Sequence, residues 1–120
     1  MSNHGGKIWD NVPGVAHRRY GPGTSFDLID TLQPGTSLIV LCYALGDTES
    51  FMAPGGKTYT SPAWDFVVTS DQDPGGYVAD VLVDTGGDIT QQLGEQGTCD
   101  ALRQRLVPPS GSNASNPGVG

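Results

Sequence analysis

The sequence has little charge, few basic residues and no long apolar run. Only 16% of its 120 residues are charged, with six Lys and Arg residues against 13 Asp and Glu residues. Nucleic-acid binding requires a basic patch or stripe, so a formal net charge of −7 excludes that class. No apolar run reaches the roughly 20 residues that span a bilayer, and the N-terminal residues lack the apolar region of a signal peptide. We therefore expect neither a nucleic-acid nor a membrane partner.

Apolar residues are also scarce, and turn-forming residues are abundant. Hydrophobic residues make up 36% of the chain, which also contains 18 Gly and 9 Pro. This composition predicts one small domain with a modest core, many turns and no long helix. We expect that domain over residues 13–106, with a flexible N-terminal arm at 1–12. Pro, Gly, Ser and Asn dominate residues 107–120, which we expect to form a flexible tail.

Several short runs have the pattern of β-strands. The strongest is Ser37–Leu45, a continuous apolar run rich in β-branched residues and bounded by turn signals. Weaker or alternating runs are Val15–Arg19, Phe26–Leu32, Ala63–Thr69 and Gly76–Val83. The one helical pattern is Cys99–Leu106, which Thr98 can cap. The sequence therefore predicts an all-β fold, a small barrel or sandwich of about five to seven short strands with at most one short C-terminal helix.

The triplet Pro-Gly-Thr occurs twice, at Pro22-Gly23-Thr24 and at Pro34-Gly35-Thr36. A phosphate-binding loop would lead into a helix and carry a Lys in the Walker position, and neither triplet does. Pro followed by Gly instead favours a type II turn, with Gly at the third position taking a positive φ. We expect two such turns, each held by a local hydrogen bond from its threonine.

Candidate catalytic and metal-binding residues are weak. A nucleophilic Cys42 with His17 as base is disfavoured, because a thiol in the middle of an apolar strand is buried and inert. The Asp residues are scattered and do not follow the spacing of an EF-hand. We expect no catalytic residue, no metal and no cofactor. Cys42 and Cys99 are either two buried thiols or a disulfide, which would remove roughly 4 kcal/mol of unfolded-chain entropy.

The aromatic residues are a better indication of function. In small β-barrels, aromatic side chains at the loop end form grooves for peptides or sugars. The alternative for Phe26, Trp64 and Phe66 is that they fill the core. Tyr20, Tyr43 and Tyr59 can equally be surface residues.

The order of four motifs resembles the bacterial SH3-like (SH3b) domains that are common in secreted actinobacterial proteins. The motifs are VAHRRYGPGTSF at Val15–Phe26, LQPGTSLIVLC at Leu32–Cys42, WD at Trp64-Asp65 and GYVADVLVDTG at Gly76–Gly86. The resemblance covers about Val15 to Cys99, and the order is more specific than any one motif. It departs in the longer loop before Trp64, in an insertion at 70–75 and at Ala79, where serine is usual. It implies an SH3-like barrel in which Cys42 and Cys99 form a disulfide.

The resemblance also implies a function, since such modules are usually non-catalytic and are thought to bind peptidoglycan or its peptides. We therefore expect a binding module that is extracellular or associated with the cell wall. Its partner would be a cell-wall glycopeptide or a protein. The candidate ligand-binding residues are the aromatics and acids near the loop end: Tyr20, Tyr43, Tyr59, Trp64, Asp65, Tyr77 and Asp80.

An alternative function is a structural component of a virion, either decorating the capsid or forming part of the tail of an actinobacterial phage. The domain type is extracellular, yet the chain starts with Met and shows no leader and no enzyme domain. Neighbouring subunits would order the two low-complexity ends. The neighbouring genes would separate the two alternatives, because hydrolase genes favour the first and capsid or tail genes favour the second.

Overall fold

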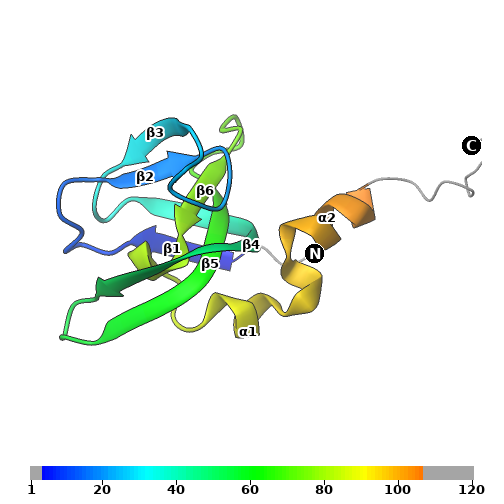
Figure 1. Ribbon diagram of the computed structural model, residues 1–120. Coiled ribbons are helices and arrows are strands. Elements are labelled where there is room, and N and C mark those ends of the chain that lie inside the picture. Colours follow the sequence, from blue (N-terminus) through cyan, green and yellow to red (C-terminus); the bar gives the residue numbers. More distant parts are fainter. Residues whose placement is uncertain (1–3, 107–120) are drawn as a thin grey trace, which may run out of the picture.

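Seven antiparallel strands form one sheet in the computed structural model, which describes residues 4–106 (Figure 1). The strand order is β3-β2-β6-β5-β4-β1-β7. The strands are β1 (His4–Ile8), β2 (Ala16–Arg19), β3 (Leu28–Leu32), β4 (Ser37–Met52), β5 (Thr58–Val68), β6 (Gly76–Ala79) and β7 (Val83–Asp84). The expected small all-β fold is confirmed. The expected tail at 107–120 lies outside the described residues, and no helix within 4–106 has the length and apolar character needed to cross a membrane.

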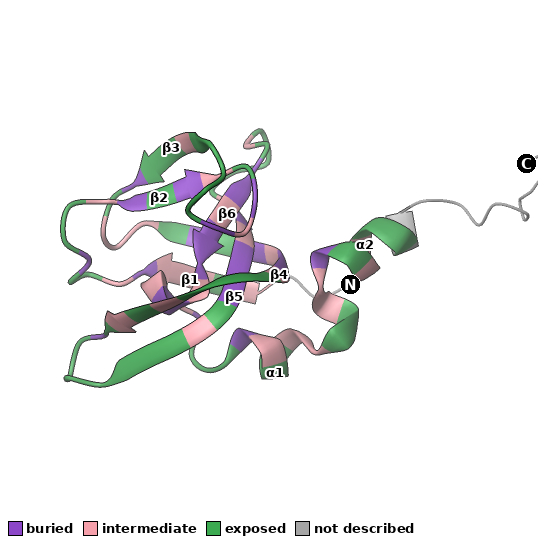
Figure 2. Ribbon diagram, viewed as in Figure 1, coloured by how far each residue is buried: buried purple, intermediate pink, exposed green. Residues whose placement is uncertain are grey.

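One apolar cluster forms most of the core, and every strand contributes to it. Its members include Ile8, Ala16, Leu32, Val40, Val67, Val78 and Val83, one from each strand. Alternate side chains of each strand point to the same face of the sheet. In a flat sheet, side chains from all seven strands would spread over that face and could not form one cluster. The sheet therefore curls around its inner face. The buried stretches of β2, β6 and β5 lie next to one another (Figure 2).

The N-terminal segment differs from the flexible arm expected at 1–12. Strand β1 pairs with β4, from His4 opposite Val40 to Lys7 opposite Ser37, and also with β7. Ile8 is fully buried. The segment HGGK has little strand propensity of its own, so pairing with strands on both sides decides its conformation. A Cβ on Gly6 would lie 2.9 Å from the Asp84 carbonyl oxygen, so glycine permits the close approach of β1 to β7.

The hairpin of β4 and β5 is longer than the sequence predicts. The stretch expected as a loop, residues 46–62, is mostly strand, and a register irregularity falls between Leu45 and Glu49. Beyond it, Ser50 lies opposite Thr60 with their hydroxyl oxygens 2.8 Å apart. Cross-strand pairs of this kind stabilise the pairing of two strands whose residues are polar and lack the alternation typical of a strand. We call residues 46–61 the hairpin extension; Figure 1 shows it reaching past the other strands.

The C-terminal part contains more helix than expected. The run expected as one strand at Gly76–Val83 is divided by a 3₁₀ turn, η1 (Asp80–Leu82), into β6 and β7. Two α-helices follow rather than at most one: α1 (Ile89–Leu93) and α2 (Cys99–Leu106), with a second 3₁₀ turn, η2 (Glu95–Gly97), between them. The Asp88 carboxylate caps α1 by accepting from the Thr90 N–H. Helix α2 has the predicted range, and the predicted cap is confirmed because the Thr98 hydroxyl accepts from the Ala101 N–H.

The two Pro-Gly-Thr triplets adopt different conformations. Gly35 has a φ of 82°, and both the N–H and the hydroxyl of Thr36 donate to the Gln33 carbonyl, so the second triplet confirms the expected turn. The expectation is wrong for the first triplet, because Gly23 is not among the positive-φ glycines. There the N–H of Thr24 donates to the Asp47 carboxylate on β4 at 2.9 Å. The first triplet therefore lacks the positive-φ glycine turn and is held by contact with β4 together with local bonds such as that from the Phe26 N–H to the Gly23 carbonyl.

A disulfide joins Cys42 of β4 to Cys99 of α2, as the sequence resemblance implied. The two Cα atoms lie 4.8 Å apart across a sequence separation of 57. Tyr43 forms an isolated parallel bridge with Thr98, and its hydroxyl donates to the Gly94 carbonyl at 2.9 Å. These contacts attach the helical segment to the long central strand.

Candidate functional site

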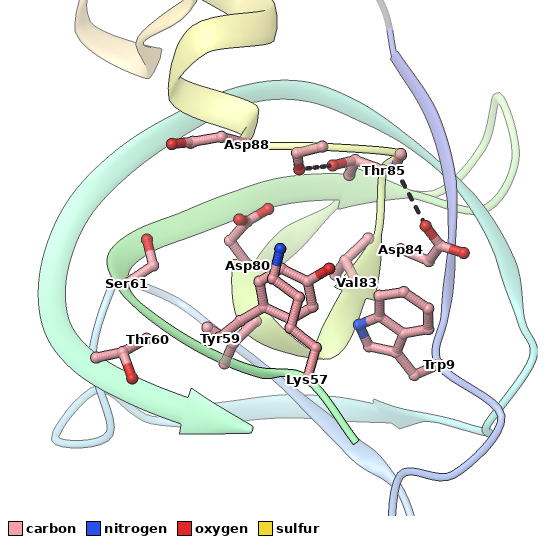
Figure 3. Close-up of a pocket in the computed structure, with 13 residues that line it drawn as sticks. Trp9, Lys57, Tyr59, Thr60, Ser61, Asp80, Val83, Asp84, Thr85 and Asp88 are labelled. Carbon is pink, nitrogen blue, oxygen red and sulfur yellow. Dashed lines mark hydrogen bonds between the residues drawn. The ribbon is translucent and has the colours of Figure 1, made fainter. Parts of the chain in front are cut away.

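A pocket of about 600 Å³ opens between three segments that are far apart in the sequence (Figure 3). Trp9, directly after β1, supplies one side. The hairpin extension supplies Lys57, Tyr59, Thr60 and Ser61. The third side is the stretch from η1 to the start of α1, which contributes Asp80, Val81 and residues 83–88. The sequence predicts no strand for β1 or for the hairpin extension, yet both segments are needed to form this pocket.

Two stacked aromatic rings form one wall of the pocket. The ring centroids of Trp9 and Tyr59 are 6.3 Å apart and their planes are inclined by 14°. The ammonium of Lys57 lies 5.1 Å from the centroid of the Tyr59 ring, which is within the range of a cation–π contact. The indole N–H of Trp9 is buried and has no acceptor among residues 4–106. This wall therefore combines a π surface with an unused hydrogen-bond donor.

Three carboxylates line the same pocket, and two of them hold the local backbone. Asp84 accepts from the Gly86 N–H at 3.1 Å, and Asp88 accepts from the N–H and the hydroxyl of Thr90. The third, Asp80, stands at the start of η1, and its Oδ1 is buried with no donor in the described part of the chain. Asp80 is thus the lining carboxylate that accepts from no backbone N–H among the described residues, and its side chain is half-buried.

Asp80 is coupled to a second carboxyl group, that of Asp65 on β5. Asp65 is 0% exposed, and neither of its oxygens has a donor among the described residues when both groups are ionised. The two carboxyl groups are within hydrogen-bonding reach of each other. Two carboxylates cannot bond to each other, so the hydrogen bond requires one of them to carry a proton. We call Asp65 and Asp80 the carboxyl pair.

Burial is the main cause of the unusual titration of this pair. It raises the pKa of Asp65 well above its ordinary value, and the hydrogen bond to Asp80 and the charge of Asp80 raise it further. Burial also raises the pKa of Asp80, where the hydrogen bond from Asp65 acts in the opposite direction and the charge of Asp88 adds to the increase. Burial is more complete at Asp65, so the shared proton favours Asp65 and the negative charge favours Asp80.

The loop that closes the pocket, residues 85–88, is fixed by side chains from two other elements. The Thr85 carbonyl oxygen is 2.7 Å from Nε2 of His4 on β1 and accepts from the Gln92 amide of α1 at 2.8 Å. The buried Thr85 hydroxyl donates to the Gly87 carbonyl. The wall is therefore held in place from both the N-terminal strand and the helical segment.

A second charge cluster is centred on a buried arginine of β2. Arg18 of β2 is 5% exposed and forms two parallel bonds to Asp30, at 2.7 Å from Nε and 2.6 Å from Nη2. It also donates to Asp73 at 2.6 Å. Burial acts to raise the pKa of Asp73, but the bonds from Arg18, Gly75 and Thr69 together hold it well below its usual range. We call Arg18, Asp30 and Asp73 the Arg18 cluster; every charge in it has a partner.

Three of the seven predicted ligand-binding residues come together. Tyr59 and Asp80 line the pocket, and Asp65 forms the carboxyl pair with Asp80. Tyr43 and Trp64 are buried and hold the fold, the Trp64 indole by donating to the Asp47 carbonyl at 2.8 Å. Tyr20 and Tyr77 are absent from the pocket lining: Tyr20 is 69% exposed, and Tyr77 packs edge-on against Phe66 with centroids 5.2 Å apart.

Sequence reasoning missed Trp9 and Lys57 as parts of the site. Trp9 was assigned to a flexible arm and Lys57 to a loop, because neither segment has a strand pattern. The available signal was a large aromatic in a chain with few apolar residues, which rarely stays solvated. The core hypothesis holds for Trp64 alone, since Phe66 is half-buried and Phe26 is exposed.

No group of three or more His, Cys, Asp or Glu side chains within residues 4–106 is arranged to hold a metal ion. The lining of the pocket combines the aromatic wall of Trp9 and Tyr59 with the carboxylates of Asp80, Asp84 and Asp88. Such a site suits a ligand that presents both a flat or apolar face and a positive charge or hydrogen-bond donors.

Comparisons with known proteins give two relatives. Over 73 residues, the chain is 34% identical to the uncharacterized protein YraI of Bacillus subtilis (strain 168). It is 36% identical over 73 residues to the uncharacterized protein YraJ of the same organism. Each alignment covers 58% of this chain, and the chain spans 57% and 58% of the lengths of the two relatives. No family model and no solved structure matches the chain.

Proposed function

We propose that the protein is a non-catalytic SH3-like binding module that acts at the bacterial cell surface and recognises peptidoglycan or its peptides. The observation that carries the proposal is the pocket, in which the Trp9–Tyr59 wall faces the carboxylate of Asp80. Glycopeptides present sugar faces that stack on aromatic rings, together with amide and amino groups that donate to carboxylates. The order of sequence motifs that resembles SH3b domains supports the same class.

The burial of Asp65 favours binding over catalysis. A carboxyl dyad that hydrolyses a bond must present both carboxyl groups to the reacting water and substrate. Asp65 is 0% exposed, so the carboxyl pair presents only Asp80 to the pocket. The other two lining carboxylates, Asp84 and Asp88, accept from backbone N–H groups, so the lining does not present a matched pair of free carboxyl groups.

The disulfide supports a location outside a reducing compartment. Disulfides persist in oxidising environments and are rare in the cytosol. The Cys42–Cys99 bond fastens α2 to the central strand, so the folded form depends on that environment. The alternative role as a virion component, and the actinobacterial origin expected with it, stay predictions.

Co-sedimentation with purified, insoluble peptidoglycan tests this proposal. At low salt, wild-type protein should be retained on the sacculi. Tyr59→Ala removes the exposed ring of the aromatic wall and should weaken retention about 2- to 10-fold, because an aromatic contact contributes roughly 0.5–1.5 kcal/mol.

The matched control is Tyr20→Ala, which removes a still more exposed tyrosine that is not part of the pocket lining. Its retention should equal that of wild type. Absence of wild-type retention would refute the proposed function, and an equal loss in both variants would place the binding surface elsewhere.

A further inference from the structure

The charges that line the pocket are unbalanced. Lys57 is the only cation among the lining side chains, against the three carboxylates Asp80, Asp84 and Asp88. Behind Asp80, the fully buried Asp65 has no cationic partner in the described structure. A buried acid is normally matched by a cation or a donor set, as in the Arg18 cluster. The pocket therefore lacks a positive group that its chemistry would accept.

The position of Lys57 shows which kind of group the pocket accepts. Its ammonium lies over the Tyr59 ring, 5.1 Å from the centroid, on the wall that faces the acids (Figure 3). It makes no ion pair within 4.0 Å among residues 4–106, and the Asp80 carboxylate has no cationic partner in that part of the chain. The protein's own ammonium thus lies at the aromatic wall, whereas the carboxylate has no ammonium beside it among the described residues.

We infer that the pocket is a receptor for a primary ammonium group, which is held between the Asp80 carboxylate and the Trp9–Tyr59 wall. An ammonium has three donors and no acceptor, which fits a site of acceptors and π faces. Asp65 is the positioning residue: the hydrogen bond that it donates orients the Asp80 carboxyl group. Lys57 competes with the ligand by placing its own ammonium in the same pocket.

This inference deepens the proposed function and depends on it for the source of the amine. Two parts of a glycopeptide can supply a primary ammonium: an amino sugar without its acetyl group, and the side chain or terminus of a peptide. The shared chemistry is the ammonium. The two sources differ in the neighbouring group, which is a pyranose ring in one and an alkyl chain in the other.

NMR titration of wild-type protein with paired small probes tests the inference. The amines are a glucosamine trisaccharide and Nα-acetyl-lysine amide, and each is compared with its N-acetylated form. At least one amine should shift the Trp9 indole resonance and bind ~10-fold or more tightly than its acetylated partner, because acetylation removes the charge. The amine that binds more tightly identifies the source, and failure of both amines would overturn the inference.

Three variants locate the binding. Asp80→Asn should lose ~10-fold or more in affinity for the amine, since it removes a desolvated charge partner. Asp71→Asn, at an exposed acid that is not part of the pocket lining, should bind like wild type.

Lys57→Met should bind about 2–5-fold more tightly because the competing ammonium is gone. The Lys57 side chain is exposed, so this variant gives an answer even if Asp80→Asn fails to fold; unchanged or weaker binding by Lys57→Met would overturn the competition.

Chemically N-acetylated sacculi separate this inference from the proposed function. Loss of retention after acetylation supports both. Equal retention on native and acetylated sacculi leaves the proposed function standing and overturns the ammonium receptor. Binding of the amine probes without any retention on sacculi supports the receptor and refutes the wall ligand.

Discussion

The Arg18 cluster and the carboxyl pair bury charge in opposite ways. Arg18 is surrounded by acceptors, with two bonds to Asp30, one to Asp73 and one to the Val67 carbonyl. Asp65 is buried as deeply, yet within residues 4–106 its carboxyl group has no cationic partner and is coupled to another acid, Asp80. The comparison shows that the burial of a charged residue does not by itself reveal its role, and that its hydrogen-bond and ion-pair partners must also be known. The matched charges of the Arg18 cluster hold the fold together, and the unmatched carboxyl pair is where we propose that a ligand binds.

The two clusters also respond to pH in opposite directions. The pKa of Asp73 is lowered in the fold, so its stabilisation is fully present above the unfolded carboxyl pKa of about 4 and is lost as the pH falls below it. The pKa of Asp65 is raised, so the folded protein keeps a proton that the unfolded chain releases. The free energy of unfolding that Asp65 contributes therefore falls as the pH rises from about 4 through the pKa of Asp65 in the folded protein. As far as these two groups decide it, stability should be greatest between the acid range in which Asp73 is protonated and the higher range in which Asp65 loses its proton.

Removing the cation of the Arg18 cluster should have the largest effect. Arg18→Met leaves Asp73 buried without its partner, and losing one member of a buried ion pair costs roughly 3–5 kcal/mol. Denaturant unfolding at pH 7 measures the loss. Arg19→Met is the matched control, because this neighbouring arginine makes one exposed bond to the Phe26 carbonyl and should lose less than about 1 kcal/mol. Similar losses in the two variants would show that the cluster is not a special source of stability.

Neutralising one acid of the same cluster should have a smaller effect that depends on pH. Asp73→Asn keeps one oxygen, which can accept from Thr69 or from Gly75 but not from both, and it removes the charge that faces Arg18. We expect a loss of about 2 kcal/mol at pH 7. Below pH 4 the difference in free energy of unfolding between the variant and wild type should shrink, since Asp73 of the wild type is then increasingly protonated and loses its stabilising charge. Unfolding curves from pH 7 down to pH 2.5 measure this, with the exposed Asp71→Asn as control. A difference that stays constant over this range would contradict the assigned cause.

The carboxyl pair should give the smallest effect, and with the opposite sign. Asp65→Asn supplies a donor to Asp80 without a titrating proton, so we expect the variant to be about 1 kcal/mol more stable than wild type at pH 8. Near pH 4 the two proteins should converge. Thermal or denaturant unfolding at pH 4, 6 and 8 checks the trend, with the exposed Asp27→Asn as reference. Parallel pH profiles for wild type and Asp65→Asn would show that Asp65 does not retain its proton in the fold.

Much of the fold could be predicted from the sequence, because many of its elements have local signals. The start of β4 is an uninterrupted apolar run, and α2 has both its range and its Thr98 cap encoded locally. The elements that were missed have no such signal. Strand β1 reads as HGGKI, and the hairpin extension carries polar residues whose strand pairing depends on partners across the ladder.

The candidate site was predicted only in part for the same reason. Tyr59, Asp65 and Asp80 were chosen because aromatic and acidic residues near turns are common in binding sites. Trp9 could not be placed beside Tyr59, since the two are 50 positions apart and meet only after β1 and the hairpin extension have folded. The alternation of β5 places Asp65 on the same face as Val67 but does not reveal that this is the inner face, because an acid in an alternating run usually faces solvent.

The sequence by itself determined the all-β class, the α2 helix and the positive-φ turn at Gly35, because these depend on contacts between near neighbours in the chain. Tertiary structure decided the rest. The two Pro-Gly-Thr triplets illustrate this: identical residues form a local turn at Pro34 and a different shape at Pro22, where the Pro22 carbonyl accepts from the Asp47 N–H of β4. A contact from a distant strand outweighs the local preference there. In the same way, only the curled sheet turns Asp65 from a solvated acid into a buried member of the carboxyl pair.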